Sequence, residues 1–213
     1  MADHLFSPSL LLAEQVEREL LPLTGRTIIE LGAGCALPSL LSTTLQKPPH
    51  LVVITDYPDD TIMNNLKGNV TRNSPHVSPG CEVQCIGYEW GKDVSLLLSL
   101  VPDSDGYDVV ILSDLLHFDS SHDVLLSSLT SLLRKSPSAR TYVAAGKYTQ
   151  PQVCDHFLHE GESAGIIWEN GEDDPEWRGS LDVKGGGLDQ EQLGVRKGMC
   201  RWWIGRWNDN HLN

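Results

Sequence analysis

A glycine turn between a strand pattern and a helix pattern constrains the fold of this 213-residue chain more than any other feature. Residues 26–31 form a short apolar run rich in β-branched side chains, and Gly32-Ala33-Gly34 follows it directly. Residues 36–46 then have the composition of a helix. Glycines at such a turn allow a tight backbone path and let N–H groups approach a ligand closely. This order is typical of α/β proteins that bind nucleotide-like cofactors.

A second apolar run, residues 51–56, ends in Asp56, which lies 24 residues beyond Gly32 (56 − 32). An acidic residue about 20 residues after the glycine turn is placed to accept hydrogen bonds from ribose hydroxyls. Two simpler interpretations remain open at this point. Asp56 could merely cap the following helix, and the two glycines could be ordinary turn residues.

Strand and helix patterns alternate along most of the chain. The patterns predict helices at 7–21, 36–46, 59–70, 94–101, 123–134 and 151–162 and strands at 26–31, 51–56, 81–86, 107–112, 140–145, 165–168 and 199–207. Such alternation predicts an α/β fold, a Rossmann-like seven-stranded sheet that is mostly parallel and has helices on both faces. Ser7 is expected to cap the first helix, and Glu14 is assigned to its water-facing side.

The C-terminal part follows a different pattern. Residues 170–192 are polar and acidic, contain Gly185-Gly186-Gly187, and indicate a loop or an open hairpin. Because no helical pattern separates the last two strands, the final strand is expected to be antiparallel. Its three tryptophans resemble a binding platform, although a core role is the simpler interpretation. We expect a single domain, 1–213, composed of an N-terminal helix segment (1–25), a cofactor-binding core (26–169) and an acidic loop with the closing strand (170–213).

Composition excludes several classes of protein. The chain has 16 Lys and Arg against 29 Asp and Glu, a formal net charge of -13, so nucleic acid is not expected as a partner. The acidity would suit a basic protein or a cationic small molecule, or it serves solubility alone. No apolar run is long enough to cross a membrane, and no secretory signal is evident. Five cysteines without a disulfide or zinc spacing favour a reducing, cytoplasmic location and no metal site. We also expect a monomer.

The glycine turn also narrows the cofactor. A dinucleotide binder requires G-x-G-x-x-G, whereas this chain has Leu37 in the third glycine position, and no phosphate-binding G-K-[S/T] is present. A ligand with one ribose, an adenine and no phosphate needs only two glycines, a preceding acid and the ribose carboxylate. S-adenosylmethionine is such a ligand, and its positive charge suits a site framed by Glu30, Asp56 and Asp114.

The runs E-L-G-A-G-C-A-L-P, V-V-I-T-D-Y-P-D, N-N-L-K-G-N-V, G-Y-E-W-G and Y-D-V-V-I-L-S-D-L-L occur in this order. Together they resemble the seven-β-strand methyltransferases, and more narrowly the eukaryotic family of small protein-lysine and N-terminal methyltransferases. The resemblance extends from about Leu5 to Trp207. Fungal members of that family modify translation elongation factor 1-alpha, and some carry nicotinamide N-methyltransferase-like names.

The resemblance implies a role for each matching position. Gly32, Ala33 and Gly34 would form the turn beneath the methionine moiety, with Glu30 before them. Asp56 would hold the ribose hydroxyls, Tyr57 and Trp90 would lie beside the adenine, and Ser113 would line the pocket. Asp114 matches the acid of the D-x-x-[Y/F] motif near the acceptor amine, which makes it the candidate catalytic residue. Trp90 as a packing residue and Asp114 as a cap of the next segment remain alternatives.

Two positions depart from the family pattern. Phe6 stands where the family usually has tryptophan, and His117 occupies the aromatic position of the D-x-x-[Y/F] motif. The resemblance implies an S-adenosylmethionine-dependent N-methyltransferase acting on a lysine or N-terminal amine of a protein such as an elongation factor. A small-molecule N-methyltransferase and a cofactor-binding module without catalysis are the alternatives.

Overall fold

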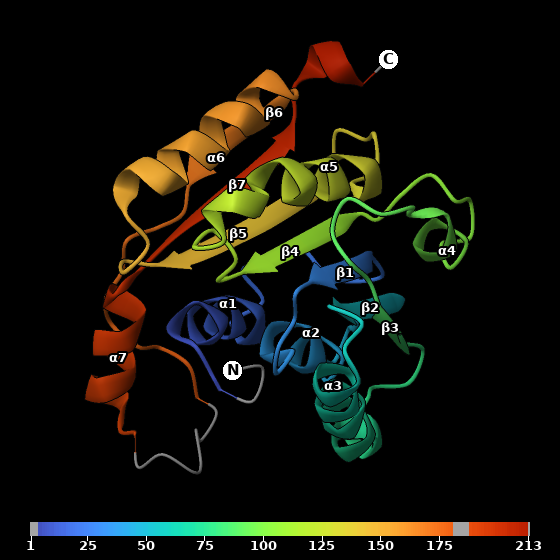
Figure 1. Cartoon of the computed structure of the whole chain (residues 1–213). Coiled ribbons are helices and arrows are strands. Elements are labelled where there is room, and N and C mark those ends of the chain that lie inside the picture. Colours follow the sequence, from blue (N-terminus) through green and yellow to red (C-terminus); the bar gives the residue numbers. More distant parts are fainter. Residues whose placement is uncertain (1–3, 181–187, 213) are drawn as a thin grey trace.

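Seven strands form one mixed sheet in the computed structural model, which describes residues 4–180 and 188–212 (Figure 1). In chain order the strands are β1 (Thr27–Leu31), β2 (Leu51–Asp56), β3 (Glu82–Gly87), β4 (Val109–Ser113), β5 (Arg140–Gly146), β6 (Ile166–Asn170) and β7 (Cys200–Trp207). In space their order is β3-β2-β1-β4-β5-β7-β6. Strands β1 to β5 pair in parallel, and β7 lies between β5 and β6, antiparallel to both. The predicted fold class, with its antiparallel final strand, is confirmed.

Helices cover both faces of the sheet. Helices α1 (Ser7–Glu17), α2 (Leu37–Ser42) and α3 (Asp60–Asn73) lie on one face, and α4 (Ser95–Leu98), α5 (His122–Leu132) and α6 (Pro151–Ser163) lie on the other (Figure 1). Each face has its own apolar cluster, because the central strands β1, β2 and β4 carry apolar residues toward both sides. Short 3-10 turns at Ser74–His76, Asp119–Ser121 and Asp209–His211 complete the connections.

The first two helices are shorter than predicted. Helix α1 ends at Glu17 rather than at residue 21, and α2 spans only Leu37–Ser42. Ser7 is the first helical residue of α1, and Phe6 is its N-cap, so the predicted serine cap is wrong. The Ser7 hydroxyl instead accepts a hydrogen bond from Arg196 at 3.1 Å. The helix start is therefore fixed by a contact from the far end of the chain rather than by a local cap.

A seventh helix, α7 (Gln190–Gly198), was not predicted: it begins at the end of the predicted 170–192 loop and continues through residues 193–198, to which no element was assigned. Its N-terminus has a capping box, in which the Asp189 side chain bonds the backbone of Gln192 and the Gln192 side chain bonds the backbone of Asp189. The helix packs beside α1 at the edge of the molecule (Figure 1). The predicted Gly185-Gly186-Gly187 element lies outside the described residues.

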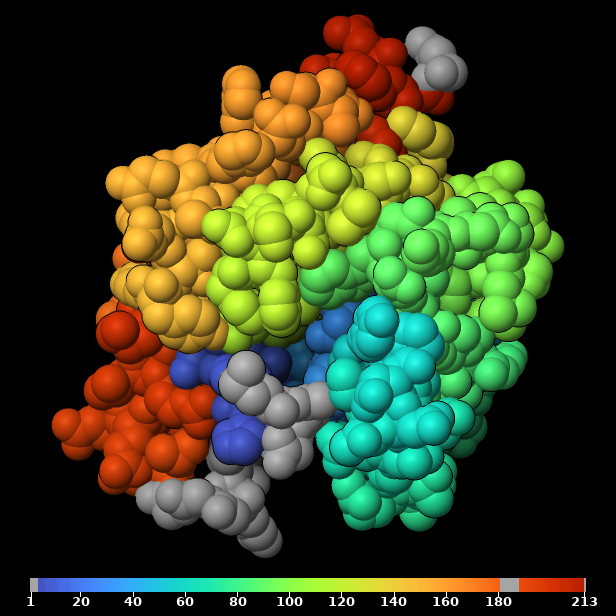
Figure 2. Space-filling model, viewed as in Figure 1, coloured from blue at the N-terminus to red at the C-terminus, as the bar shows by residue number. Residues whose placement is uncertain are grey.

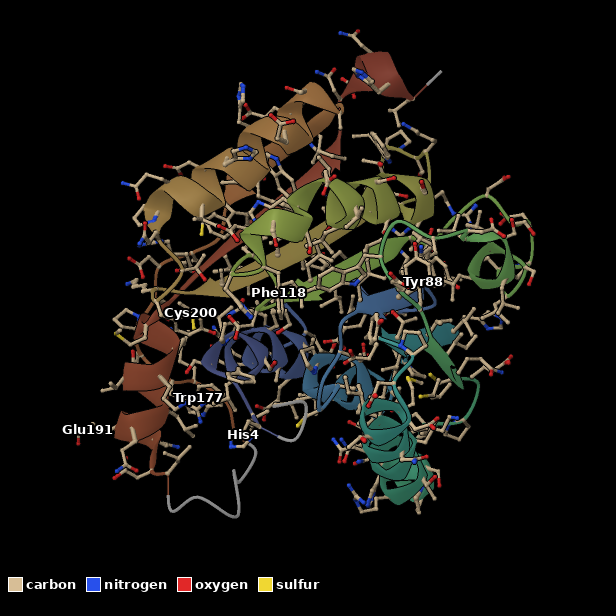
Figure 3. All side chains as sticks on the ribbon, viewed as in Figure 1. His4, Tyr88, Phe118, Trp177, Glu191 and Cys200 are labelled. Carbon is tan, nitrogen blue, oxygen red and sulfur yellow. The ribbon has the colours of Figure 1, made fainter. Side chains whose placement is uncertain are left out.

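A buried ion pair joins α7 to α1. Lys197 Nζ lies 2.6 Å from Glu14 Oε2, and both side chains are almost fully excluded from solvent. Glu14 therefore does not face water, contrary to the prediction. Trp177 packs with Leu10 and Leu193 in a small apolar cluster at the same contact, and Figure 3 shows it beside α7. The acidic segment and α7 thus cover a side of α1 that would otherwise be exposed.

The tryptophans of β7 belong to the core. Trp203 and Trp207 enter the apolar cluster on one face of the sheet, and Trp202 enters the cluster on the other. Each is less than a tenth exposed, which excludes a tryptophan platform on this strand. Within the described residues, no helix has the length and apolar character that crossing a lipid bilayer requires.

Candidate cofactor and acceptor site

A cleft of about 1050 Å³ opens at the carboxyl ends of β1, β2 and β4. The chain runs outward from β1 to β2 and β3 and then returns to β4 on the other side of β1, so this edge is the topological switch point of the sheet. Open α/β sheets bind their ligands at such a point. Figure 2 shows the surface hollowed between the cyan α3 and the yellow-green segment at α5, with blue atoms of the N-terminal third at its base.

Eight of the nine predicted site residues line this cleft. They are Gly32, Ala33, Gly34, Asp56, Tyr57, Trp90, Ser113 and Asp114. Further lining residues come from every neighbouring element and include His4, Phe6, Ser9, Cys35, Ile62, Asn65, Tyr88, Leu115, His117, Phe118 and Tyr148. The cleft therefore brings together the predicted cofactor residues and the predicted catalytic residue in one space.

The glycine turn has a backbone that only small or flexible residues adopt readily. Gly32 and Gly34 have φ values of 57° and 55°, in the left-handed region that penalises a Cβ atom. A Cβ on Gly32 would lie 2.8 Å from Leu115 Cδ2 and 2.9 Å from Trp90 Cζ2. Gly32 is thus required both by its backbone angle and by the side chains packed over it.

Asp56 links the glycine turn to the end of β2. Its Oδ2 accepts a hydrogen bond from the N–H of Gly34 at 2.7 Å, and its Oδ1 accepts one from the N–H of Tyr57 at 2.7 Å. The N-cap of α3 is Asp59, whose side chain accepts from the first turn of that helix, so Asp56 is not the cap. An ionised carboxylate has about four lone-pair positions. Two of them remain to accept hydrogen bonds from a ligand's hydroxyl groups.

Glu30 does not line the cleft, unlike the other predicted cofactor residues. Its side chain is fully buried, and Oε2 accepts a hydrogen bond from the N–H of Ser39 in α2 at 3.3 Å. Burial raises the pKa of this carboxyl to about 8, although the Ser39 hydrogen bonds oppose the shift. Glu30 therefore supports the turn from behind, by tying β1 to α2.

Aromatic side chains form the wall opposite α3. Trp90 and Phe118 meet edge to face, with ring centroids 5.8 Å apart, and Figure 3 shows Phe118 across the cleft from His4. Tyr57, which follows Asp56 directly, is more than half exposed at the rim. An aromatic wall beside a carboxylate with lone pairs left to accept hydrogen bonds suits a flat base such as adenine. Trp90 also packs against the core, so the packing interpretation is confirmed, and its place in the lining is compatible with a ligand contact.

Helix α1 contributes to the cleft through residues that sequence patterns missed. Ser9 Oγ lies 2.9 Å from Ser113 Oγ at the end of β4, and Phe6, the N-cap, lies in the lining about a third exposed. Phe6 thus occupies the cleft position that the family pattern assigns to tryptophan. The signal available for Ser9 was only its place on the apolar side of α1, which cannot reveal a partner 104 residues away.

Asp114 stands directly after β4 with a φ of 64°, a left-handed conformation that aspartate tolerates better than most residues. Its carboxylate accepts hydrogen bonds from the N–H of Gly146 at 3.3 Å and from the hydroxyl of Tyr148. Burial raises its pKa, whereas the Tyr148 hydroxyl, the Gly146 N–H and the nearby His117 lower it. These contacts reach β5 and the turn after it, rather than the segment that a capping aspartate would stabilise.

Tyr148 was not predicted, although a signal existed. It follows β5 by two residues, and functional side chains gather where parallel strands end. Its ring centroid lies 6.3 Å from that of His117, and both rings line the cleft together with Asp114. Across residues 4–180 and 188–212 no group of three or more His, Cys, Asp or Glu side chains is arranged to hold a metal ion.

Solved structures share the fold over nearly the whole chain. A methyltransferase described as S-adenosylmethionine-dependent, from Aquifex aeolicus, superposes with a TM-score of 0.57 at 16% identity, covering 91% of this chain and 88% of that one. A Haloferax volcanii complex of the Trm112 methyltransferase activator and a methyltransferase matches with a TM-score of 0.56 at 13% identity, covering 94% and 90%. At such identities the likeness establishes the fold.

Sequence comparison gives closer relatives. The protein N-terminal and lysine N-methyltransferase EFM7 of Gibberella zeae is 35% identical over 156 residues, which are 69% of this chain and 58% of that protein. The enzyme of the same name from Eremothecium gossypii is 36% identical over 146 residues, 66% of this chain and 52% of that protein. The chain spans about half the length of the curated relatives it matches.

The sequence profile of the family described as lysine methyltransferase matches residues 5–169. That span contains all nine predicted site residues and the cleft wall formed by Tyr148, and it ends within β6. The strands, the glycine turn and the carboxylates that carried the sequence resemblance lie in the matched part. The chain therefore belongs to the lysine methyltransferase family.

Proposed function

We propose that the protein is an S-adenosylmethionine-dependent N-methyltransferase that acts on a lysine or N-terminal amine of a protein. One observation carries the proposal: the glycine turn, Asp56 and the Asp114 carboxylate all line a single cleft. A methyltransferase needs a cofactor-binding site next to an acceptor site, because it must hold the methyl donor and the acceptor in a fixed orientation relative to each other.

The residues present suit S-adenosylmethionine. The space over Gly32 admits no Cβ, the remaining lone pairs of Asp56 can accept ribose hydroxyls, and Trp90 and Tyr57 offer flat surfaces for adenine. Leu37 occupies the position of the third glycine of dinucleotide binders. Its side chain packs against the apolar cluster of Leu10 and Trp177. When bound, S-adenosylmethionine supplies an activated methyl group.

Asp114 is the residue that we propose to orient the acceptor amine. A lysine amine has a reference pKa of about 10.4 and arrives protonated, so it needs a group that attracts the cation and helps remove a proton before it can react. Asp114 is nearly buried, and its two oxygens are held by Gly146 and Tyr148. A carboxylate fixed in this manner can orient an amine and receive its proton. The rings of His117 and Phe118, with centroids 4.0 Å apart, line the same cleft and can flank the side chain that carries the amine.

The proposed substrate class rests on the names of the relatives and on the net charge of the chain. Those relatives are named protein N-terminal and lysine N-methyltransferases. The net charge of -13 favours encounter with a basic protein, such as a translation elongation factor. Five cysteines without disulfides support a reducing, cytoplasmic setting, and we propose that the protein works there as a monomer.

Two variants separate cofactor binding from transfer. Asp114→Asn should lower turnover by about 100-fold or more while S-adenosylhomocysteine binds with unchanged affinity in calorimetry. Asp56→Ala should weaken that binding by at least about tenfold, because the carboxylate that accepts the ribose hydroxyl hydrogen bonds is lost. Methyl transfer is measured with radiolabelled cofactor on a cell lysate and, separately, on a panel of amines and pyridines. Labelling confined to the small molecules would refute the protein acceptor, and binding without any labelling would indicate a module that has lost catalysis.

A further inference from the structure

Tyr148 combines an exposed ring with an internally bonded hydroxyl. The side chain is 60% exposed at the mouth of the cleft, yet its hydroxyl donates a hydrogen bond to Asp114 Oδ2. An exposed tyrosine gains no stability from turning its hydroxyl inward unless the partner needs a donor. Here the partner is a nearly buried carboxylate, for which a second hydrogen bond matters most.

The backbone around Tyr148 is built to hold this orientation. The ring folds back over Gly146 so closely that a Cβ at that position would collide with it. The N–H of Lys147 donates to the carbonyl of Met199 at 2.7 Å, and its ammonium group donates to the carbonyl of Gly198 at 2.6 Å. The N–H of Thr149 closes the turn on Gly146 at 3.0 Å. Residues on both sides of Tyr148 are therefore anchored, and its ring has a fixed place.

Asp114 is anchored from its own side. Its N–H donates to the carbonyl of Ala144 in β5 at 2.7 Å, which fixes the left-handed backbone after β4. Oδ1 receives the Gly146 N–H and Oδ2 receives the Tyr148 hydroxyl, so each oxygen keeps a lone pair free for a ligand. If the Tyr148 hydroxyl were absent, only the longer contact from Gly146 would fix the carboxylate plane.

We propose that the Tyr148 hydroxyl is the positioning group that holds Asp114 ionised and aimed at the acceptor amine, an inference that rests on the proposed function. The ring and the hydroxyl have separable tasks. The ring forms the wall facing His117, and it remains in Tyr148→Phe, whereas the hydroxyl acts only through Asp114. Because the hydroxyl donates to the charged form of the carboxylate, it favours that form.

Titratable groups from three elements face Asp114. His117, from the segment after β4, and Tyr148, from the turn after β5, favour the charged form of its carboxyl. The Cys200 thiol lies at the start of β7, and burial followed by the nearby Asp114 carboxylate raises the pKa of that thiol, so it faces Asp114 as a neutral group. Burial raises the Asp114 pKa, and the hydrogen bond from Tyr148 is the largest effect that lowers it. Removing this hydrogen bond raises the Asp114 pKa further. As the pH falls, Asp114 then becomes protonated at a higher pH than in wild type, and activity that needs the carboxylate is lost at that higher pH.

The first experiment compares pH profiles of kcat/KM for wild type and Tyr148→Phe. We expect a loss of about tenfold near neutral pH and an acidic limb shifted upward by about one pH unit, with S-adenosylhomocysteine affinity unchanged. In an Asp114→Asn background the same change should cost nothing further, since the hydroxyl acts through the carboxylate. Tyr107→Phe is the matched control: its hydroxyl donates to the Leu97 carbonyl in the core at 2.6 Å, so it should alter stability but not the acidic limb.

A second measurement does not depend on methyl transfer. The Asp114 carboxyl is titrated by carbon NMR in aspartate-labelled wild type and Tyr148→Phe, and its pKa should rise in the variant. If wild type transferred no methyl group to any protein, the proposed function would fail while this titration still tested the link between Tyr148 and Asp114. An unchanged Asp114 pKa, or an acidic limb that stays in place, would overturn the inference.

Discussion

Replacing Gly32 with alanine tests the structural basis of the cofactor site most directly. Gly32 begins the turn after β1 with a φ of 57°. The added Cβ would lie 2.8 Å from Leu115 Cδ2 and 2.9 Å from Trp90 Cζ2, closer than non-bonded carbon atoms approach. The substitution therefore has two costs: backbone strain and displacement of two side chains. The second of these disturbs the wall proposed for adenine.

The two costs can be separated by a matched glycine. Gly25 has a φ of 66° in the loop before β1, and a Cβ there would meet no heavy atom within 4 Å. Gly25→Ala should thus cost only the left-handed strain, about 1–2 kcal/mol. Gly32→Ala should cost that amount and about 1–3 kcal/mol more for overpacking against Leu115 and Trp90. The expected total for Gly32→Ala is about 2–5 kcal/mol.

Thermal unfolding and calorimetry measure the two consequences. For a chain of this size, 1 kcal/mol lowers Tm by about 2–4 °C, so Gly25→Ala should lower it by about 2–8 °C and Gly32→Ala by more. S-adenosylhomocysteine should bind Gly25→Ala with unchanged affinity. It should bind Gly32→Ala at least about tenfold more weakly, since a loss of about 1.4 kcal/mol has that effect.

The comparison of the two variants decides the outcome. If both alanine variants melt at the same temperature and bind the ligand equally well, then Leu115 and Trp90 do not pack over the turn as the structure has them. If Gly32→Ala loses stability but keeps full ligand affinity, the turn is structural and the cofactor lies elsewhere. Either result would refute the reasoning that connects Gly32, Trp90 and adenine.

Two further predictions concern buried charges. Glu30 has a folded pKa of about 8 against an ordinary value of 4.5, so its stabilising contribution is complete below about pH 4.5 and is lost as pH rises toward 8; Glu30→Gln should therefore gain in Tm relative to wild type between pH 5.5 and 8.5, and a constant difference across that range would contradict the buried, protonated carboxyl. Lys197→Met leaves the Glu14 carboxylate buried without its cation and should cost about 3–5 kcal/mol in urea unfolding. Lys92→Met, which removes an exposed pair with Glu89, should cost less than about 1 kcal/mol, and equal losses for the two lysines would show that the Glu14 pair is not buried.

The order of strands and helices could be predicted because local patterns determine it. Apolar runs such as residues 51–56 identify central strands without reference to the rest of the chain, since both faces of these strands are covered. Helix α7 was missed because its segment is polar, and the acidic loop before it suggested no periodic pattern. Its capping box at Asp189 and Gln192 was a usable local signal. The position of β7 between β5 and β6 follows from pairing, which no local pattern encodes.

The part of the cleft that we propose for the cofactor could be located from the sequence for a similar reason. Gly32 and Asp56 belong to one strand–turn–helix–strand unit, and their spacing reflects contacts within that unit, such as the bond from Gly34 to Asp56 across 22 residues. Glu30 also belongs to this unit, but its side chain is buried and does not line the cleft. Its position beside two glycines suggested a ligand contact, whereas alternation along β1 turns its side chain toward Ser39 and away from the cleft.

The acceptor half depends on partners that are distant in sequence. Asp114 acquires its environment from Tyr148, and Ser113 acquires its partner from Ser9, across 34 and 104 residues. Each of these contacts requires that β4 lie between β1 and β5, so it exists only after the sheet has formed. The same dependence explains why the motif around Asp114 identified a chemistry but not an acceptor. The residues that line the cleft around Asp114 come from α1, from the segment after β4 and from the turn after β5. We therefore expect substitutions among them to change the acceptor while the glycine turn and the fold stay the same.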